Sequence, residues 1–228
     1  NETLRTNIEL TKLIADICKD KKVKLIFIST DQLFDGNKKL YSENDMTSPI
    51  NSYAYSKYLA EKAITKVSKS SLIIRTNFYG WGTSYRKSFS DFIIDNISKK
   101  NFIELFNDVY YTPIFIGNLV ELVSKLIEKD AKGIYNVCGN DRITKFDFGK
   151  KLANKFKLNT NFINDTSISK SKLYAPRTLD MSLSNLKIKE FLKIEIPNLN
   201  DQIDYLKDSM KNKKIRELIK LWFHMANI

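Results

Sequence analysis

The sequence of 228 residues has few of the residue types that most catalytic and metal sites need. It holds one histidine, His224, and two cysteines, Cys18 and Cys138, which lie far apart without ligand spacing around them. A single histidine excludes an internal Ser-His-Asp or Cys-His arrangement and any multi-histidine metal site, and the carboxylates match no calcium loop. We therefore predict no metal site, buried reduced thiols and a cytoplasmic location. Proton transfer would have to use Tyr, Lys or carboxylate groups.

Glycine is also scarce, and its placement bears on nucleotide binding. The chain has seven glycines, none of them before Gly36, and the pattern G-x-G-x-x-G occurs nowhere. A Rossmann nucleotide site needs this loop because glycine lets the backbone approach the pyrophosphate at a helix N-terminus. We therefore expect this chain alone to bind a dinucleotide weakly.

Long apolar runs are missing too, since no stretch approaches the ~20 residues of a membrane span, and no secretory signal is recognised. The hydrophobic share of 43% is ordinary for a globular protein and excludes wholesale disorder. The net charge is +12, but most of the positive residues are lysines spread along the chain. Nucleic-acid recognition favours clustered arginine. We expect no nucleic-acid partner, although a positive field would attract a diphosphate.

One stretch, residues 28–64, organises the rest. An apolar run over residues 23–28 predicts a buried strand that ends at Ser29-Thr30-Asp31. Turn signals follow, and a helical pattern then begins near Tyr53. Tyr53 and Lys57 are four residues apart and would share one helix face.

This spacing suggests acid–base chemistry on a carbonyl group. An ammonium close to Tyr53 would lower the pKa of the phenol toward the range where proton transfer is efficient. Thr30 would hold the substrate oxygen by a hydrogen bond, and a nicotinamide would supply the hydride. The pattern repeats at Tyr58 and Lys62, about 140° further round the helix, so we predict that only Tyr53 and Lys57 face the cleft and that the second pair is solvated.

The motifs around this stretch resemble those of the dTDP-4-dehydrorhamnose reductase family, which belongs to the extended short-chain dehydrogenase/reductases. They read Ser29-Thr30-Asp31-x-x-Phe34-Asp35-Gly36, Glu43-x-Asp45 and Pro49-x-Asn51-x-Tyr53-x-x-Ser56-Lys57-x-x-x-Glu61. The resemblance continues through Arg75-Thr76, Asn107-Asp108, Pro113, residues 133–139 and Ala175-Pro176-Arg177. It covers about residues 2–205.

The resemblance implies roles for particular residues. It implies a catalytic triad of Thr30, Tyr53 and Lys57, of which Tyr53 and Lys57 would also contact the cofactor, NADPH or NADH. Substrate binding by the dTDP-sugar would involve Thr30, Asp31, Phe78 and Arg177. Two departures affect which sugar is bound: Phe78 stands where the family usually has Trp, and Gln32 where it often has Tyr.

The patterns and the resemblance together predict an α/β fold: a partial Rossmann-like parallel sheet flanked by helices, with a smaller α+β substrate lobe. Residues 1–80 would form the C-terminal part of the NAD(P)-binding domain with the catalytic helix. Residues 81–206 would be mainly the substrate lobe, with 113–130 returning to the Rossmann part, and 207–228 a helical extension. The family carries its glycine loop upstream of the first helix here, so the strand at 23–28 is expected at an open apolar edge. A homodimer or an N-terminal segment would be a partner.

Other segments give structural predictions. Strands are predicted over residues 71–76, 114–116 and 133–137, and helices over 2–20 and over 119–127, the latter capped by Gly117-Asn118. Residues 164–178 read as loop. Phe89 and Phe92 belong to a helical stripe predicted to be core, whereas Tyr79 and Trp81 could equally stack on a ligand or pack internally.

We expect an NADPH-dependent oxidoreductase that reduces the 4-keto group of a dTDP-6-deoxy sugar for dTDP-L-rhamnose biosynthesis, with impaired activity in this chain alone. One alternative is a non-catalytic sugar-nucleotide or regulatory module, because the family also resembles the regulatory subunit of methionine adenosyltransferase. Another is a nucleotide-sugar epimerase or dehydratase, which Gln32 disfavours because dehydratases usually place an acidic residue there.

Overall fold

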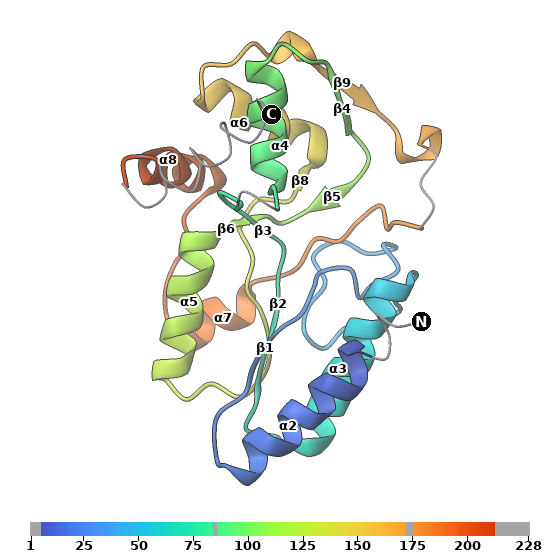
Figure 1. Ribbon diagram of the computed structural model, residues 1–228, viewed down its shortest axis with the longest axis vertical. Helices are drawn as coiled ribbons and strands as arrows, with labels where there is room; N and C mark the ends of the chain where they lie inside the picture. The colour runs from blue at the N-terminus through green and yellow to red at the C-terminus, as the bar shows by residue number, and fades with distance from the viewer. Residues whose placement is uncertain (1–5, 84–85, 172–175, 213–228) are drawn as a thin grey trace.

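The computed structural model describes residues 6–83, 86–171 and 176–212, which form two lobes (Figure 1). The lobe drawn at the bottom is built on a three-stranded parallel sheet in the order β1-β2-β7. Its strands are β1 (Ile26–Ile28), β2 (Leu72–Arg75) and β7 (Gly133–Asn136). The register sets Ile28 beside Ile74, and Ile74 beside Tyr135. Because the strands are parallel, their carboxyl ends meet at the same end of the sheet.

Helices cover both faces of this sheet, as buried parallel strands require. One face carries α2 (Thr11–Asp20) and α3 (Ser52–Val67) (Figure 1). The π-helix η1 (Thr6–Leu10) directly precedes α2. The other face carries α5 (Ile116–Glu128) and α7 (Leu186–Leu192). Successive strand side chains point to opposite faces. Ile73 therefore packs with Ala15 and Ile64, whereas Leu72 and Ile74 pack in the cluster that α5 and α7 complete.

The second lobe contains three helices and short strand pairs. The helices are α4 (Phe89–Ser98), α6 (Lys145–Lys155) and α8 (Leu199–Ser209). The first pair is β4 (Ile103–Phe106) with β9 (Ile163–Thr166). The other two are β5 (Tyr110–Tyr111) with β8 (Ile143–Thr144) and β3 (Phe78–Tyr79) with β6 (Ile114–Phe115). The 3-10 turns η2 (Thr160–Phe162) and η3 (Ile168–Lys170) flank β9. The core centres on Phe148, whose ring lies 5.0 Å from that of Tyr79 and 5.8 Å from that of Tyr111.

The predicted α/β fold is confirmed, but several boundaries differ. The strand expected over 23–28 is limited to Ile26–Ile28, the residues that pair with β2. Helix α5 starts at Ile116 rather than Leu119, because the extended Phe115 serves as N-cap and its N–H donates to Gln202 Oε1 at 2.7 Å. Residues 164–166, expected within a loop, belong to β9 because that strand pairs with the distant β4.

More of the chain after residue 113 belongs to the lobe of the three-stranded sheet than we predicted. We predicted it over residues 113–130, but β7 pairs with β2, and Ile188 and Leu192 of α7 join the same buried cluster. The sequence pattern missed this because a strand's partner is set by packing and not by its own residues. The C-terminal extension predicted over 207–228 is represented by the end of α8, and residues 213–228 lie outside the described residues.

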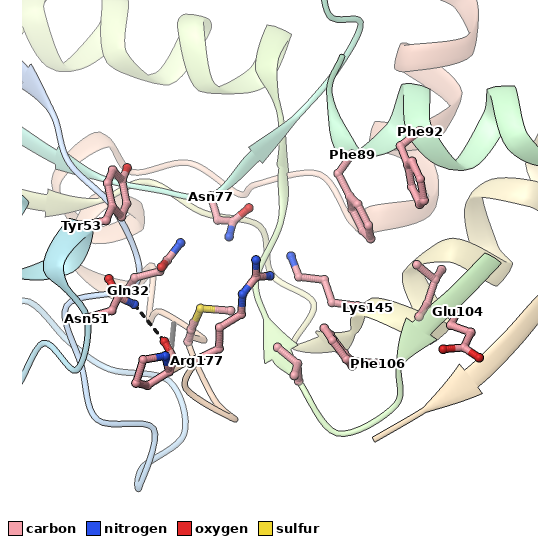
Figure 2. Close-up of a pocket in the computed structure, with 14 residues that line it drawn as sticks. Gln32, Asn51, Tyr53, Asn77, Phe89, Phe92, Glu104, Phe106, Lys145 and Arg177 are labelled. Carbon is pink, nitrogen blue, oxygen red and sulfur yellow. Dashed lines mark hydrogen bonds between the residues drawn. The ribbon is translucent and has the colours of Figure 1, made fainter. Parts of the chain in front are cut away.

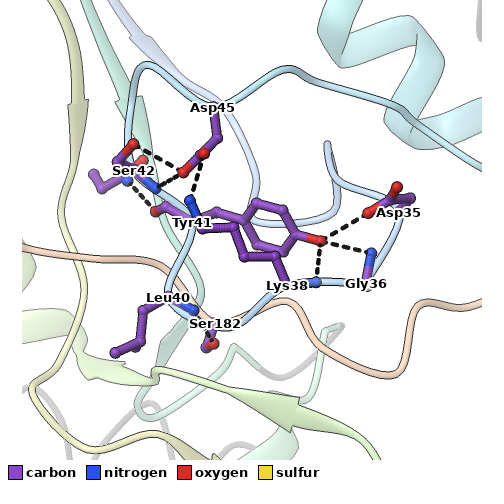
Figure 3. A network of polar contacts seen from close by, with 9 residues as sticks. Asp35, Gly36, Lys38, Leu40, Tyr41, Ser42, Asp45 and Ser182 are labelled. Atoms are coloured by element: carbon purple, nitrogen blue, oxygen red, sulfur yellow. Dashed lines mark hydrogen bonds and ion pairs between the residues drawn. The ribbon is translucent and has the colours of Figure 1, made fainter.

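The long loop between β1 and α3 is fixed to the rest of the molecule through Tyr41 (Figure 3). Its hydroxyl donates to Asp35 Oδ1 at 2.7 Å and accepts from the N–H groups of Gly36 and Lys38. Gly36 has φ +87°, and a Cβ there would lie 3.1 Å from the backbone N of Leu179, so glycine suits both the turn and the close approach. This loop sets the positions of Asp31 at its start and Tyr53 just after its end.

None of the helices within the described ranges has the length and apolar character needed to cross a membrane. Over the same ranges, no group of three His, Cys, Asp or Glu side chains is arranged to hold a metal ion.

Candidate active site

The site begins where β1 ends. The N–H of Ser29 still donates to Ile74 O at 2.7 Å, and the chain then leaves the sheet with Thr30 and Asp31 almost fully buried. Thr30 Oγ1 donates to Asp31 Oδ1 at 3.2 Å, and Asn77 Nδ2 donates to Asp31 Oδ2 at 2.5 Å. Asn77 follows β2, so the carboxyl ends of neighbouring parallel strands supply one polar cluster, as open α/β sheets do at their ligand sites.

Helix α3 brings the phenol to this cluster. Asn51 is its N-cap and accepts from the N–H of Ala54 at 2.8 Å, which places Tyr53 in the first turn. The hydroxyl of Thr30 lies close enough to the phenol of Tyr53 to lower its pKa. Lys57, one turn later, donates from Nζ to Ile28 O at 2.7 Å. The structure thus brings the three residues of the predicted triad together at the end of β1.

The second Tyr-x-x-x-Lys pair lies elsewhere on α3. Tyr58 packs against the cluster of Leu33 and Phe34, and Lys62 Nζ lies 5.5 Å from the centroid of its ring. Tyr58 is therefore partly buried, not solvated as expected, because the loop after β1 folds over it. Neither residue lines the cavity that Tyr53 faces.

The electrostatics of Tyr53 differ from the expectation. Burial raises the pKa of its phenol above the usual value and the charge of Asp31 adds to this, whereas the Thr30 hydrogen bond and Arg86 oppose it. The prediction that Lys57 lowers this pKa is wrong for the structure described, because the ammonium is directed to Ile28 O. Burial lowers the pKa of Lys57 itself, against the charge of Glu61. At neutral pH Tyr53 is thus a protonated phenol that can donate a proton.

Two further charged groups have pKa values displaced toward neutrality. Burial raises the pKa of Asp31 from 3.8 to about 6, against the Asn77 hydrogen bond and the charge of Lys145. Burial lowers the pKa of Lys145 from 10.5 to about 7; Asp31 opposes this shift and the charge of Arg177 adds to it. Perturbed groups of this kind cluster at functional sites.

A cavity of about 530 Å³ opens between the two lobes (Figure 2). Tyr53 lies at one end, Asn77, Lys145 and Arg177 lie near the middle, and aromatic side chains lie at the other end. The lining residues come from the loop after β1, the start of α3, the end of β2, α4, β4, α6 and the segment before α7. They are Gln32, Asn51, Tyr53, Asn77, Phe89, Phe92, Glu104, Leu105, Phe106, Val109, Lys145, Pro176, Arg177 and Met181. Its size suits a small organic ligand.

The predicted substrate residues are only partly brought together. Arg177 lines the cavity, and Thr30 and Asp31 adjoin it through Tyr53 and Asn77. Phe78 does not line it, since its half-exposed ring borders a neighbouring hollow. It ends up there because β3 pairs with β6 and turns its side chain away from the Tyr53 end.

Of the two roles considered for Tyr79 and Trp81, the structure shows internal packing. Tyr79 is 2% exposed in the core of the second lobe, and Trp81 Nε1 donates to Leu206 O at 3.1 Å. By contrast, Phe92, predicted to be core, is 41% exposed and lines the cavity.

Lys145 was missed by the sequence reasoning. It is the first residue of α6, after the N-cap Thr144, whose hydroxyl accepts from the N–H of Asp147 at 3.0 Å. The capping pattern predicts that helix start, but nothing in the local sequence indicates that the side chain enters a cavity shared with Tyr53.

The residues present fit one end of a dinucleotide. Tyr53, with its phenol 46% exposed, and Lys57 could hold a nicotinamide ribose beside the substrate cavity. The described residues before Gly36, however, include no glycine turn on which a pyrophosphate could rest. The fit is therefore to the reactive end of the cofactor alone.

The family profile described as "RmlD substrate binding domain" matches residues 1–212. The chain belongs to this family. The resemblance drawn from the motifs is thereby confirmed.

Individual relatives agree with this membership. A probable low-salt glycan biosynthesis reductase of Haloferax volcanii is 27% identical over 194 residues, which are 83% of this chain and 65% of that protein. Methionine adenosyltransferase 2 subunit beta of Rattus norvegicus is 26% identical over 143 residues, covering 59% of this chain and 42% of the relative. The chain therefore spans less than two thirds of the length of either curated relative.

Among solved structures, the RmlD-family fold is matched by dTDP-4-dehydrorhamnose reductase from Bacillus anthracis in complex with NADP. The TM-score is 0.83 at 23% identity, over 89% of this chain and 72% of that chain. At this identity the likeness establishes the Rossmann-like fold.

Proposed function

We propose that this chain carries the substrate-binding and proton-donating part of a reductase that acts on the keto group of a nucleotide-linked 6-deoxy sugar, with NADPH as hydride donor. The observation that carries the proposal is the convergence of the hydroxyl groups of Thr30 and Tyr53 at one end of a cavity between the lobes. Family membership, the Haloferax reductase and the NADP-bound Bacillus structure support the assignment.

In this proposal each residue has a defined task. When the ligand binds, the Thr30 hydroxyl turns its one proton from Asp31 to the ketone oxygen, and Tyr53, kept protonated by its raised pKa, donates a proton to the same oxygen. The resulting phenolate faces the positive charge of Arg86. Nicotinamide, when bound, supplies the hydride. Lys57, half-buried beside Ile28, holds the ribose next to Tyr53.

Asp31 orients the sugar in this scheme. Its carboxylate is held by the hydrogen bond from Asn77 to Oδ2, so Oδ1, which is released when Thr30 turns to the ketone, points at a fixed position for a sugar hydroxyl group. A carboxylate that is already buried and oriented costs little further ordering when the ligand binds.

The test uses purified residues 1–228 with dTDP-4-dehydrorhamnose. The chain should bind the sugar nucleotide in calorimetry, should bind NADPH more weakly because it lacks a glycine loop, and should form the reduced sugar slowly at millimolar NADPH. Failure to bind the sugar nucleotide would contradict the proposal, as would rapid turnover of the kind shown by a complete reductase at micromolar NADPH.

A second candidate is a non-catalytic sugar-nucleotide or regulatory module. The observation that favours it is the similarity to methionine adenosyltransferase 2 subunit beta. Intact sugar-nucleotide binding without any reduced product, even at saturating NADPH, would select this function. An epimerase or dehydratase would instead give a changed sugar without net NADPH consumption, and Gln32 beside Asp31 disfavours it.

A further inference from the structure

A buried ion pair lies one helical turn beyond Lys57. Glu61 follows Lys57 by four residues on α3, so the two side chains share a helix face with Cβ atoms about 5–6 Å apart. The carboxylate of Glu61 binds the guanidinium of Arg75, the last residue of β2: Nε donates to Oε1 at 3.1 Å and Nη2 donates to Oε2 at 2.7 Å. Both side chains are 4% exposed. The negative charge of Glu61 is thus held in the interior, next to Lys57.

Stability alone does not account for this pair. Taking two charges out of water costs about as much free energy as their attraction returns, and apolar side chains of similar volume often replace such a pair without loss of stability. Arg75 also keeps Nη1 buried without a hydrogen-bond partner among the described residues, which costs further free energy. The pair therefore points to a role of its charges beyond folding.

Lys57 is the group on which the charge of Glu61 acts. Burial lowers the pKa of the Lys57 ammonium, and the charge of Glu61 opposes this shift. The contacts that β1 gives the ammonium carry no formal charge, since Nζ donates to Ile28 O at 2.7 Å and lies 4.4 Å from the ring centroid of Phe27. Tyr53, one turn earlier on α3, is a neutral phenol at neutral pH. Glu61 is therefore a negative charge that helps to keep Lys57 protonated.

Arg75 fixes the place of the Glu61 carboxylate. Its backbone belongs to the central strand β2, and its guanidinium lies 5.5 Å from the ring centroid of Phe34. The ring of Phe34 stacks at 4.1 Å on that of Tyr41, which anchors the loop after β1 (Figure 3). Helix α3, strand β2 and this loop are thereby joined at the ion pair. They are the same elements that bring the polar groups together at the Tyr53 end of the cavity.

We propose that Glu61, held in place by Arg75, is a positioning residue for Lys57 and keeps the Lys57 ammonium in its charged, hydrogen-bond-donating form. An ammonium has three N–H donors; Ile28 O takes one of them, and two remain for hydroxyl groups. Glu61 touches neither substrate nor cofactor in this scheme and acts through Lys57. The inference deepens the proposed function and rests on it for the ribose that Lys57 holds.

The experiment measures the protonation of Lys57 directly, in residues 1–228 and without a cofactor. Trace labelling with acetic anhydride modifies neutral amines only, so mass spectrometry of the labelled peptide reports the neutral fraction of Lys57 at each pH. Glu61→Gln removes the charge with little change of shape, and Glu61→Asp keeps the charge. Lys66, an exposed lysine near the end of the same helix, is the internal control.

The labelling of Lys57 at pH 8 should rise by about tenfold in Glu61→Gln, because an opposite charge nearby favours the ammonium form. Its half-maximal pH should move down, whereas easier access of the reagent would raise only the plateau. Labelling of Lys66 should change by less than about twofold, because solvent and salt screen an exposed charge. Glu61→Asp should stay within about threefold of the wild type.

A second variant covers loss of stability. Glu61→Gln leaves the Arg75 guanidinium buried without a counter-charge, which destabilises a fold, whereas replacing both partners by apolar side chains is often neutral. The double variant Glu61→Met/Arg75→Met should therefore fold and should also show increased labelling of Lys57. An unchanged half-maximal pH in the folded double variant overturns the assignment. An equal shift in Glu61→Asp and Glu61→Gln overturns it as well, because the charge would then not be the cause.

These results separate the inference from the proposed function, because the labelling needs neither cofactor nor turnover. Labelling of Lys57 that follows the charge of Glu61, together with no reduced sugar, would refute the reductase and leave this assignment standing. If reduced sugar forms, Glu61→Gln should raise the KM for NADPH about threefold more at pH 9 than at pH 6.5, where Lys57 is protonated in both proteins. An equal rise at both pH values would mean that Glu61 acts only as structural support and would overturn the inference.

Discussion

The two sides of helix α3 are built differently. On the cavity side, Asp31 and Asn77 bind one another, Lys145 rests on Tyr111, and both lobes contribute walls. On the side of the sheet edge, β1 pairs with β2 alone among the described strands. Apolar side chains there lie in solvent, with exposures of 56% for Leu13, 50% for Ile17 and 40% for Ile28.

The difference shows which side of α3 is ordered by contacts within the described residues. Asp31 and Asn77 are oriented by each other before any ligand binds, which is the condition for tight and specific binding. An open strand edge and an apolar stripe leave backbone groups unpaired and apolar area in water, both of which favour association with further structure. The cavity side is thus packed within the described residues, whereas the edge of β1 is not covered by them.

The largest expected effect is on the proposed proton transfer at the cavity side of α3. Tyr53→Phe removes the proton donor and should slow formation of the reduced sugar by about 10²- to 10⁴-fold, with sugar-nucleotide affinity changed by less than about threefold because the ring stays. The measurement is product formation under single-turnover conditions. Tyr55→Phe, an exposed tyrosine on the same helix, is the control, and equal rates in the two variants would remove Tyr53 from the mechanism.

The next effect is on stability, and it comes from the burial of Asp31. Its pKa rises from 3.8 to about 6 on folding, so the folded state is favoured below pH 3.8 and loses that advantage as the pH rises through 6. At 1.36 kcal/mol per pKa unit, charging Asp31 costs about 3 kcal/mol at pH 8. Asp31→Asn should therefore raise the free energy of unfolding at pH 8 and change little near pH 4, while weakening sugar binding.

Urea unfolding at the two pH values measures this, with Asp20→Asn on the exposed part of α2 as control. A destabilised Asp31→Asn protein at pH 8 would mean that the hydrogen bonds from Thr30 and Asn77 outweigh the cost of burial.

A smaller effect concerns the pH dependence of ligand binding. Because the pKa of Lys145 is about 7, its charge is present below pH 7 and is lost as the pH rises. The charged groups that act on it are Arg177 and Asp31, and the pKa of Asp31, about 6, leaves Asp31 largely ionised above pH 7. Affinity for dTDP-glucose, whose diphosphate does not titrate in this range, should fall by about tenfold from pH 7 to 8.5.

Two variants sharpen this pH test. Lys145→Arg stays charged and should bind with a flat pH profile, and Lys145→Met should bind weakly with a flat profile. A decline in Lys145→Met as steep as in the wild type would assign the titration to another group.

The smallest effect is expected on the side of the sheet edge, where the apolar residues of α2 are exposed. Ile17→Gln alters an exposed residue of the α2 stripe and should change the free energy of unfolding by less than about 0.5 kcal/mol. Ile64→Ala, on the buried face of α3, should cost about 2–5 kcal/mol. Comparable losses in the two variants would show that the stripe is covered in solution, and sedimentation of the wild type would then test the homodimer, one of the two partners considered from the sequence.

Much of the catalytic element could be predicted from local sequence. Asn51 caps α3, Tyr53 and Lys57 share its face, and Thr30 and Asp31 follow a strand, because caps, helical spacing and strand ends depend on neighbours a few residues away. The electrostatic consequence could not be predicted in the same way. Lys57 is directed to Ile28 O, and burial sets the pKa of Tyr53.

The cavity itself was decided by tertiary structure. Lys145 and Arg177 reach the Tyr53 site across about a hundred residues, Phe78 is turned away by the pairing of β3 with β6, and Phe92 faces the cavity and not the core. The sequence by itself determined the family, the α/β fold and the position of the phenol, since these follow from local patterns and motifs. Which cations and rings surround the ligand depended on how two lobes pack, and packing between distant segments leaves no local signal.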